Sequence, residues 1–314
     1  MQRVSRPWVD VVVPFFGTDD ELRELTTVMS RLELGDGDTL TIVDNRPTAR
    51  PNDNPLVVSA PDIQSSYHAR NRGAARGVAP WIVFVDADVK PRADLLDRYF
   101  DPLPSETVGL LEGVVQATGP AVGRVGRYGA LRNHVGNEHV QHDGFQYAQT
   151  ANVAIRRQAF EDLGGFPDEI RSGGDADISF RIRDAGWGHE LRKEATGDHP
   201  PRDSLKAMLK QYSRYGAGTE WLSDAYPGFA QSATVTRSVA LLLLVPVRVP
   251  LARIRSGPDA ALVATIDPLV RLAFERGRFL PNVSKPTTTQ KLRHTARVVA
   301  KRTRQSLKRA PGRS

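Results

Sequence analysis

The chain has 314 residues, of which 40% are hydrophobic and 25% charged, and this ordinary globular composition excludes a wholly disordered protein. Because it contains no cysteine, it cannot form disulfides, use a catalytic thiolate or bind zinc through cysteine. The net charge of +7 comes from one segment: residues 282–314 hold ten Lys and Arg and no acid, whereas the rest carries 33 basic and 36 acidic residues.

The N-terminal residues, an apolar stretch and the basic tail suggest where in the cell the protein is located. Residues 1–7 are polar and basic, and the apolar run after them contains Asp10 and Pro14, so we expect no secretory signal and a cytoplasmic protein. Residues 239–251 are apolar but interrupted, and are shorter than the ~20 residues of a membrane span. With the basic tail, this stretch predicts peripheral attachment to an anionic membrane surface on its inner face.

The first half of the chain alternates strand-like and helix-like segments, which predicts an α/β sheet. Strands are expected at 9–13, 39–43, 56–59 and 81–85, and helices from Thr18 or Asp19 to Leu34 and at 65–77. In the second half, strands are expected at 108–115 and 151–155, and helices at 156–163, around 177–182, and at 204–215, 239–251 and 260–274. Residues 119–143 are expected to form a long loop with one helix at most.

Polar or turn residues follow three of the predicted strands. They are residues 14–17, Asp44 with Asn45, and Asp86 with Asp88. Ligands of open α/β sheets bind at the carboxyl ends of the strands, so we expect these loops to share one crevice.

The tripeptide Asp86-Ala87-Asp88 allows two interpretations. One carboxylate can bind Mg²⁺ or Mn²⁺, hard cations that proteins hold with one or two carboxylates plus substrate phosphates. Alternatively, Asp86 starts a turn and Asp88 caps the next helix. The tripeptide alone does not decide between them.

Six segments together resemble the family 2 glycosyltransferases in their order and approximate spacing. They are VVPFF at 12–16, VDN at 43–45, ARNRG at 69–73, FVDAD at 84–88, TANVAIRR at 150–157 and GGDADISFR at 173–181. The ordered set is much more specific than any one segment, and the resemblance covers about residues 9–220. It implies a GT-A fold, which is a Rossmann-like mixed sheet flanked by helices, a nucleotide-activated sugar donor, and inversion at the anomeric carbon.

The extent of the resemblance, the apolar stretch and the basic segment together predict a domain division. The GT-A domain would occupy 1–220, with a nucleotide-binding half at about 8–115 and an acceptor half at about 116–220. A helical, membrane-associating extension would follow at 221–281, and a disordered basic tail at 282–314.

Roles for individual residues follow from the resemblance. The base of the nucleotide would be held by Pro14, Phe15, Phe16 and Asp44, although Asp44 could also be a plain turn residue. The nucleotide sugar would further contact Arg70, Asn71, Arg72, Asp86, Ala87 and Asn152, with Asp86 beside the ribose and one of the two arginines merely a solvated helix residue. Asp88 would bind the divalent cation, Mn²⁺ or Mg²⁺, that bridges the diphosphate.

Asp175 is the predicted general base, because an inverting transfer needs a carboxylate that accepts the proton of the acceptor hydroxyl. Many family members have Glu-Asp at this point, whereas this chain has Gly174-Asp175. Asp177 is the second choice, and both aspartates could instead cap the following helix.

The histidines and one near-motif add further hypotheses. His199 falls where some relatives place a second metal ligand, but a single loop histidine is as often merely exposed. The cluster of His134, His139 and His142 matches no zinc spacing. Residues 211–215, QYSRY, nearly match a signature of processive synthases, but without membrane spans we expect transfer of one or a few sugars.

The predicted enzyme is thus a glycosyltransferase that uses a UDP, GDP or dTDP sugar and a glycan or lipid-linked acceptor. Two alternatives stay open from the residues alone. A nucleotidyltransferase acting on a sugar phosphate shares the crevice and the acidic residues, and a nucleic-acid-binding protein could use the basic tail. The tail has few aromatic residues and no known recognition module, so no nucleic acid is expected.

Overall fold

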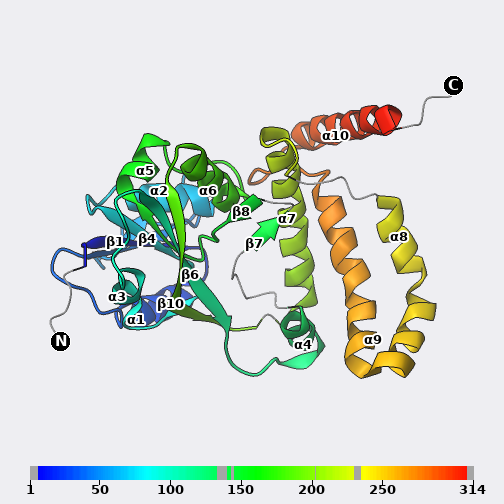
Figure 1. The fold of residues 1–314 in the computed structure, drawn as a ribbon, viewed down its shortest axis with the longest axis horizontal. Coiled ribbons are helices and arrows are strands. Elements are labelled where there is room, and N and C mark those ends of the chain that lie inside the picture. The colour runs from blue at the N-terminus through cyan, green and yellow to red at the C-terminus, as the bar shows by residue number, and fades with distance from the viewer. Residues whose placement is uncertain (1–5, 133–139, 143–144, 202, 230–234, 310–314) are drawn as a thin grey trace. The chain divides into compact units, whose positions relative to one another are not determined.

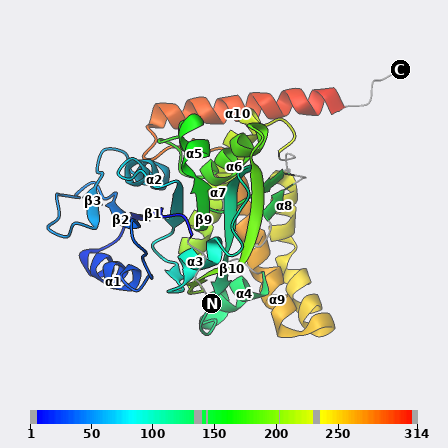
Figure 2. The same cartoon turned by 60° about the vertical axis from the view of Figure 1, so that its left-hand side comes forward.

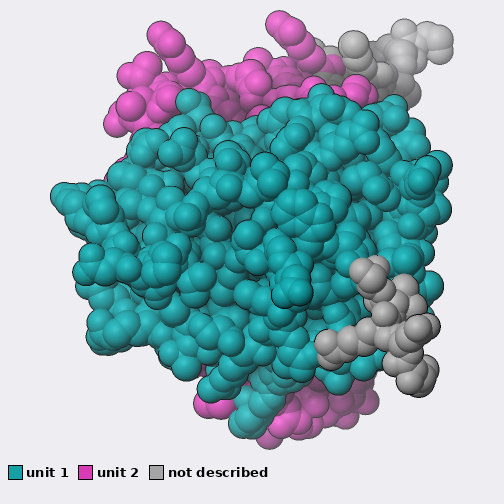
Figure 3. Space-filling model, turned by 90° about the vertical axis from the view of Figure 1, so that its left-hand side faces the viewer, with its two compact units in different colours: residues 1–120, 133–170, 174–201 teal, residues 121–132, 171–173, 202–314 magenta. Residues whose placement is uncertain are grey.

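The computed structural model describes residues 6–132, 140–142, 145–201, 203–229 and 235–309. It divides into two compact units, coloured separately in Figure 3. The first unit comprises residues 1–120, 133–170 and 174–201, and the second comprises 121–132, 171–173 and 202–314.

The first unit is built on an eight-stranded mixed sheet with the strand order β3-β2-β1-β4-β9-β6-β10-β5. Paired strands are parallel, except that β9 is antiparallel to both β4 and β6, and β5 is antiparallel to β10. The strands are β1 (Val9–Phe15), β2 (Thr39–Asp44), β3 (Val57–Ser59), β4 (Trp81–Val85), β5 (Lys90–Pro91), β6 (Val108–Ala117), β9 (Asn152–Arg156) and β10 (Gly188–His199). A separate hairpin pairs β7 (Val140–His142) with β8 (Phe145–Tyr147).

Helices cover both faces of the sheet, because its central strands are apolar on both faces (Figures 1 and 2). Alternate residues of β1, such as Val11, join one core with α1 (Asp19–Met29) and α3 (Leu95–Tyr99). On the opposite face lie α2 (Ser66–Ala74), α5 (Arg157–Asp162) and α6 (Gly174–Asp184). A Cβ atom on Gly73 of α2 would lie 2.3 Å from Val12 Cγ1, so only glycine lets this helix approach β1 so closely.

The second unit is helical. It contains α4 (Gly123–Leu131), α7 (Leu205–Ala225), α8 (Val235–Leu243), α9 (Val245–Gly277) and α10 (Thr288–Arg309), and α9 bends at Gly257, whose φ is 85°. Helices α7 and α9 cross closely, because a Cβ on Gly216 would lie 1.9 Å from the Phe274 carbonyl oxygen. Within the described part of the chain, no helix is both long enough and apolar enough to cross a membrane.

The structure differs from the sequence-based expectations in three segments. Strand β10 was not predicted, because its sequence GHELRKEATGDH is polar and lacks a strand-like apolar pattern. Residues 119–143, expected to form a long loop with one helix at most, contain the helix α4 and also the strand β7, which was not expected. The basic tail, expected to be disordered, forms α10 over Thr288–Arg309.

The tail is helical because its inner face has partners. Lys301 Nζ lies 3.0 Å from Glu220 Oε1 and 2.7 Å from Asp224 Oδ1, and Val298 is 1% exposed. The boundary expected near residue 220 falls inside α7, and α4 belongs with the helices of the second unit since Tyr128 donates a 2.7 Å hydrogen bond to Asp267.

Candidate active site at the carboxyl edge of the sheet

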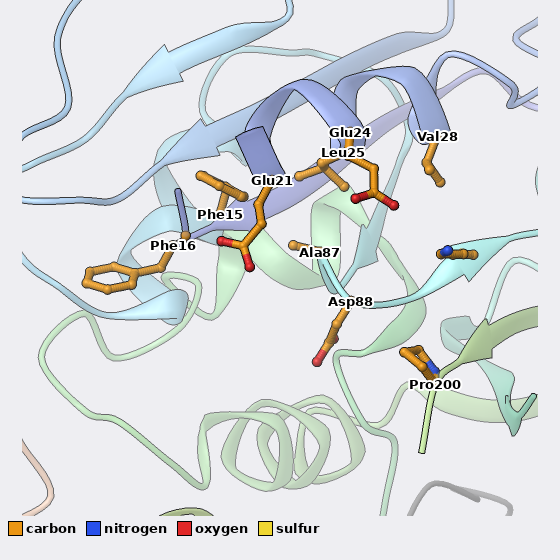
Figure 4. A pocket seen from close by; sticks show the side chains of 11 residues that line it. Phe15, Phe16, Glu21, Glu24, Leu25, Val28, Ala87, Asp88 and Pro200 are labelled. Carbon is orange, nitrogen blue, oxygen red and sulfur yellow. The ribbon is translucent and has the colours of Figure 1, made fainter. Parts of the chain in front are cut away.

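The predicted site residues of the first unit gather at the carboxyl ends of β1, β2 and β4. These three strands are adjacent and parallel, and Phe15 is directly paired with Asp44. A pocket of about 380 Å³ opens there between the end of β1, helix α1 and the Asp86-Ala87-Asp88 loop. Figure 4 shows Phe16, Glu21, Ala87, Asp88 and Pro200 around it.

Asp88 and His199 meet at this edge from different strands. Asp88 follows β4 and is half exposed, whereas His199 is the last residue of β10, and its Nε2 lies 3.0 Å from Asp88 Oδ2. His199 Nδ1 lies 2.6 Å from the Pro200 carbonyl oxygen, which can only accept, so Nδ1 carries a proton. With the proton on Nδ1, Nε2 is the nitrogen through which a neutral His199 could bind a metal ion beside Asp88.

The two groups fit a divalent cation that is completed by phosphate oxygens. One carboxylate oxygen and one imidazole nitrogen are suitable donors for Mn²⁺. Among the described residues, no group of three or more His, Asp or Glu side chains is placed to hold a metal ion. Asp88 and His199 could thus supply two of the ligands of such a cation.

Asp86 is oriented by an arginine of α2. Arg70 Nη2 donates a hydrogen bond to Asp86 Oδ1, and the arginine side chain is 3% exposed. The Asp86 backbone N–H also donates to the Ala151 carbonyl oxygen at 3.0 Å. The two aspartates of the tripeptide are thus separated: Asp86 is tied to Arg70, and Asp88 faces His199.

Asp175 lies at the start of α6 and faces α2. The Tyr67 hydroxyl donates a hydrogen bond to Asp175 Oδ1 at 3.2 Å. Burial raises the pKa of the Asp175 carboxyl above its usual value, while the positive charge of Arg70 acts in the opposite direction. Arg70 therefore connects Asp86 electrostatically with Asp175.

Asp177, the second choice for the base, is held in an ion pair with Arg181. Its Oδ2 accepts hydrogen bonds from Arg181 Nε at 2.9 Å and Nη2 at 2.6 Å. Arg181 in turn donates to the carbonyl oxygens of Leu163 and Gly165, at 2.7 Å each. This ion pair joins α6 to the end of α5.

Asp44 is buried and paired with Arg46, a residue that the sequence analysis missed. Arg46 Nη2 lies 2.7 Å from Asp44 Oδ2 and Nη1 lies 2.6 Å from Asp19 Oδ1, and these hydrogen bonds raise the pKa of Arg46. The guanidinium also lies 5.5 Å from the centre of the Phe15 ring. Among the predicted neighbours, Pro14 is buried in β1 and Phe16 is 67% exposed.

Three other residues were predicted to contact the nucleotide sugar, and each has a different environment. Asn71 Nδ2 donates to the Phe166 carbonyl oxygen at 2.7 Å and to Asp168 Oδ1 at 2.6 Å, so its amide ties α2 to the loop between α5 and α6. Asn152 is 0% exposed, and its Nδ2 donates to the carbonyl oxygens of Val114 and Ala195. Arg72 is exposed near the end of α2.

Two further sequence features are the histidine cluster and residues 211–215. His134 and His139 lie outside the described residues, as does the side chain of His142. In the second unit, Gln211 Nε2 donates to the Tyr215 hydroxyl one turn later along α7. The near-motif is thus a contact between neighbouring turns of a helix.

Comparison with known families and proteins gives consistent results. The profile described as glycosyl transferase family 21 matches residues 70–265. Glycosyltransferase AglE of Haloferax volcanii is 28% identical over 232 residues, which are 69% of this chain and 75% of the relative. The pre-mycofactocin glycosyltransferase of Mycobacterium tuberculosis is 26% identical over 236 residues, which are 70% of this chain and 48% of the relative.

A solved structure of similar fold covers nearly all of the chain. It is the mannosyltransferase PcManGT from Pyrobaculum calidifontis in complex with GDP-Man and Mn²⁺, with a TM-score of 0.51 and 15% identity, covering 95% of this chain and 87% of that one. At this identity the likeness concerns the fold.

Proposed function

The chain belongs to glycosyl transferase family 21 and is a glycosyltransferase with the predicted GT-A fold, and from this premise we propose an inverting transfer of a sugar from a nucleoside-diphosphate donor to a hydroxyl acceptor. The supporting observation is the connected set of contacts at the sheet edge: Asp88 with His199, and Asp86 with Arg70, whose charge acts on Asp175. Inversion is an inference from the resemblance to family 2.

Asp88 and His199 are the proposed ligands of the divalent cation, Mn²⁺ or Mg²⁺. Bound there with the donor's phosphates, the cation would offset the negative charge that develops on the departing nucleoside diphosphate. The Pro200 carbonyl oxygen holds His199 in the tautomer that binds metal. PcManGT, which has a similar fold, was solved with GDP-Man and Mn²⁺, which supports the use of a divalent cation with a nucleotide sugar.

The nucleotide lies along the ends of β1, β2 and β4 in this proposal. Asp86, which Arg70 orients, would accept hydrogen bonds from the ribose hydroxyls. Asp44 lies beside Arg46, so the nucleobase would contact both this ion pair and Phe15. Because Asn71 and Asn152 are engaged within the protein, they support this site rather than contact the donor.

Asp175 is the proposed general base. Its carboxylate accepts the acceptor's hydroxyl proton as the oxygen attacks the anomeric carbon, and the bond from that carbon to the diphosphate breaks. A raised pKa suits the role, because the carboxylate then binds the transferred proton more strongly. The pairing of Asp177 with Arg181 favours Asp175 over its neighbour.

Nucleotide binding in the presence of metal tests this proposal. The apparent melting temperature would be measured with UDP, GDP, dTDP and CDP, each with and without Mn²⁺. A nucleoside diphosphate at 100 times its Kd stabilises a protein by about 2.7 kcal/mol, and we expect at least one of the four to do so only with Mn²⁺. The Asp88→Ala variant should lose this metal-dependent part and the hydrolysis of the corresponding donor.

Asp162→Ala is the matched control, because Asp162 is an exposed aspartate at the end of α5. It should respond to nucleotide and metal as the wild type does. The metal assignment is wrong if Asp88→Ala also keeps the full response. The nucleotide-sugar function is wrong if none of the four nucleotides stabilises the wild type.

The acceptor in this proposal is a lipid-linked or cell-envelope glycan at a membrane surface. Support comes from α8 and the first part of α9, which expose Val239, Leu243, Leu244, Val247, Leu251 and Ile254. Residues 225–258 contain four arginines and no Asp or Glu, so this apolar surface is also cationic and suits an anionic bilayer. In α10, by contrast, Lys301 and Arg297 are paired with acidic residues of α7.

Binding to vesicles that contain phosphatidylglycerol tests the membrane surface. Leu243 and Ile254 are 74% and 82% exposed, so the double change Leu243→Glu with Ile254→Glu should abolish cosedimentation without unfolding the protein. Val78→Glu is the control, since Val78 is 76% exposed in the first unit and should not affect binding. The surface is wrongly assigned if wild type and double variant sediment equally.

A further inference from the structure

The glycine before Asp175 leaves a space that an aromatic ring fills. An added Cβ on Gly174 would lie 2.7 Å from Tyr67 Cε1 and 2.8 Å from both Cδ1 and Cζ, all shorter than any real contact of a Cβ atom. The φ angle of Gly174 is not in the left-handed region, so the backbone itself does not require glycine. The neighbouring ring is therefore what excludes a larger residue here, including the Glu found in many family 2 enzymes.

The Tyr67 ring is held firmly in this position. It is 5% exposed, its centroid lies 5.4 Å from that of Phe166, and the Arg70 guanidinium lies 5.5 Å from its centre. Its backbone N–H donates to Ser65 Oγ at 3.2 Å, and this Oγ donates to the Ile170 carbonyl oxygen at 2.7 Å. These contacts fix the first turn of α2 and, with it, the hydroxyl at the end of the ring.

We propose that Tyr67 is a positioning residue for Asp175, with its ring seated over Gly174 and its hydroxyl holding the carboxylate in the orientation for proton transfer. The hydroxyl donates to Asp175 Oδ1 at 3.2 Å, and the backbone N–H groups of Asp175 and Ala176 also interact with this carboxylate. The Tyr67 hydroxyl thus supplies the hydrogen bond from α2. This inference rests on the proposed role of Asp175 as general base.

The charges around Asp175 determine what loss of the hydroxyl would do. Burial raises the pKa of Asp175, and Arg70, the backbone N–H groups and the Tyr67 hydroxyl lower it, in that order of size. On α6 itself, the charge of Asp177 is paired with Arg181, and β8, which packs on α6, has no charged residue. Removing the hydroxyl should therefore raise the pKa of Asp175 further.

The first test is the Tyr67→Phe variant, which keeps the ring and removes only the hydroxyl. With ¹³C-labelled aspartate, and with the Asp175 signal assigned by its absence in Asp175→Asn, the carboxyl pKa should rise by up to about one unit. In donor turnover, kcat should fall about tenfold and its acidic limb should move to higher pH, with the KM for the donor unchanged. A hydroxyl with no role in positioning would leave both the pKa and the pH profile as in the wild type.

The second test removes the ring from its place without changing Tyr67. In Gly174→Ala the new methyl group collides with the ring, so the Asp175 pKa and the acidic limb should shift in the same direction as in Tyr67→Phe. Gly129→Ala is the matched control, because a Cβ there meets no atom within 4 Å, and it should match the wild type. The inference is overturned if Gly174→Ala keeps the wild-type pKa and pH profile.

Different results would contradict the role of Asp175 as general base and the role of Tyr67 as its positioning residue. If Asp175→Asn keeps full activity, the general base is wrong, whatever Tyr67 does. If Asp175→Asn is inactive but Tyr67→Phe and Gly174→Ala both behave as the wild type, only the positioning role is wrong.

Discussion

The tripeptide Asp-Ala-Asp occurs twice in this chain, at 86–88 and at 175–177, in opposite structural settings. The first copy follows strand β4, and the second lies in the first turn of helix α6. In the first copy Asp86 pairs with Arg70, and in the second Asp177 pairs with Arg181.

The remaining aspartate of each copy faces a side chain that can take part in chemistry. Asp88 faces the His199 imidazole, and Asp175 accepts from the Tyr67 hydroxyl. The comparison teaches that the tripeptide itself carries no function. The backbone setting decides which side chains each carboxylate meets.

The largest effect is expected from Asp175→Asn. Loss of a general base lowers kcat by roughly 10²- to 10⁴-fold, and donor binding should remain, because the proposed donor contacts lie at the ends of β1, β2 and β4 and not in α6. Steady-state turnover and nucleotide-induced thermal stabilisation, measured on one preparation, separate the two quantities. Activity within a few-fold of the wild type would contradict the distinction between Asp175 and Asp177.

The same variant should be more stable than the wild type at neutral pH. Because the pKa of Asp175 is raised in the native state, the native state binds this proton more tightly than the unfolded chain does. The ionised carboxylate therefore costs stability above the native pKa, and the cost disappears as the pH falls through it. Asp175→Asn should raise the melting temperature at neutral pH, and the gain should vanish in acid.

Asp177→Asn should show the reverse pattern with a smaller effect. The change breaks an ion pair in which Asp177 is nearly buried and Arg181 is about a quarter exposed, so we expect a loss of about 1–3 kcal/mol of unfolding free energy. Turnover at a temperature where the variant is folded should stay within a few-fold of the wild type. Chemical denaturation measures the unfolding free energy. A 10²-fold loss of turnover would show that Asp177, and not Asp175, is the general base.

Much of this arrangement was predictable from the sequence. Buried runs such as that of β4, and the polar residues after them, predicted the strands and their shared edge, because parallel strands end on the same side. The resemblance to family 2 glycosyltransferases then suggested a role for each of these residues. Strand β10 was not predictable in this way, because a strand near the sheet edge tolerates charged residues such as Arg192, and no alternating apolar pattern marks it.

The sequence analysis also missed which side chains pair within the site. Arg46 next to Asp44 could have been noticed, because a basic residue two positions after a predicted binding aspartate is a direct competitor for its carboxylate. Tyr67 and Asp175 are 108 residues apart, and no local pattern connects them. Only the packing of α2 against the start of α6 brings them together.

The smallest expected effect concerns the alanines in the middle of the two tripeptides. Ala176 is 1% exposed within α6, whereas Ala87 is partly buried in a loop that lines the pocket. Glycine in a helix costs about 0.5–1 kcal/mol relative to alanine, so Ala176→Gly should lower the unfolding free energy by at least that amount. Ala87→Gly should cost less, because its loop has no helical geometry to lose. Urea denaturation measures both losses of unfolding free energy. Equal losses would mean that the backbone at Ala87 is as rigid as the helix at Ala176.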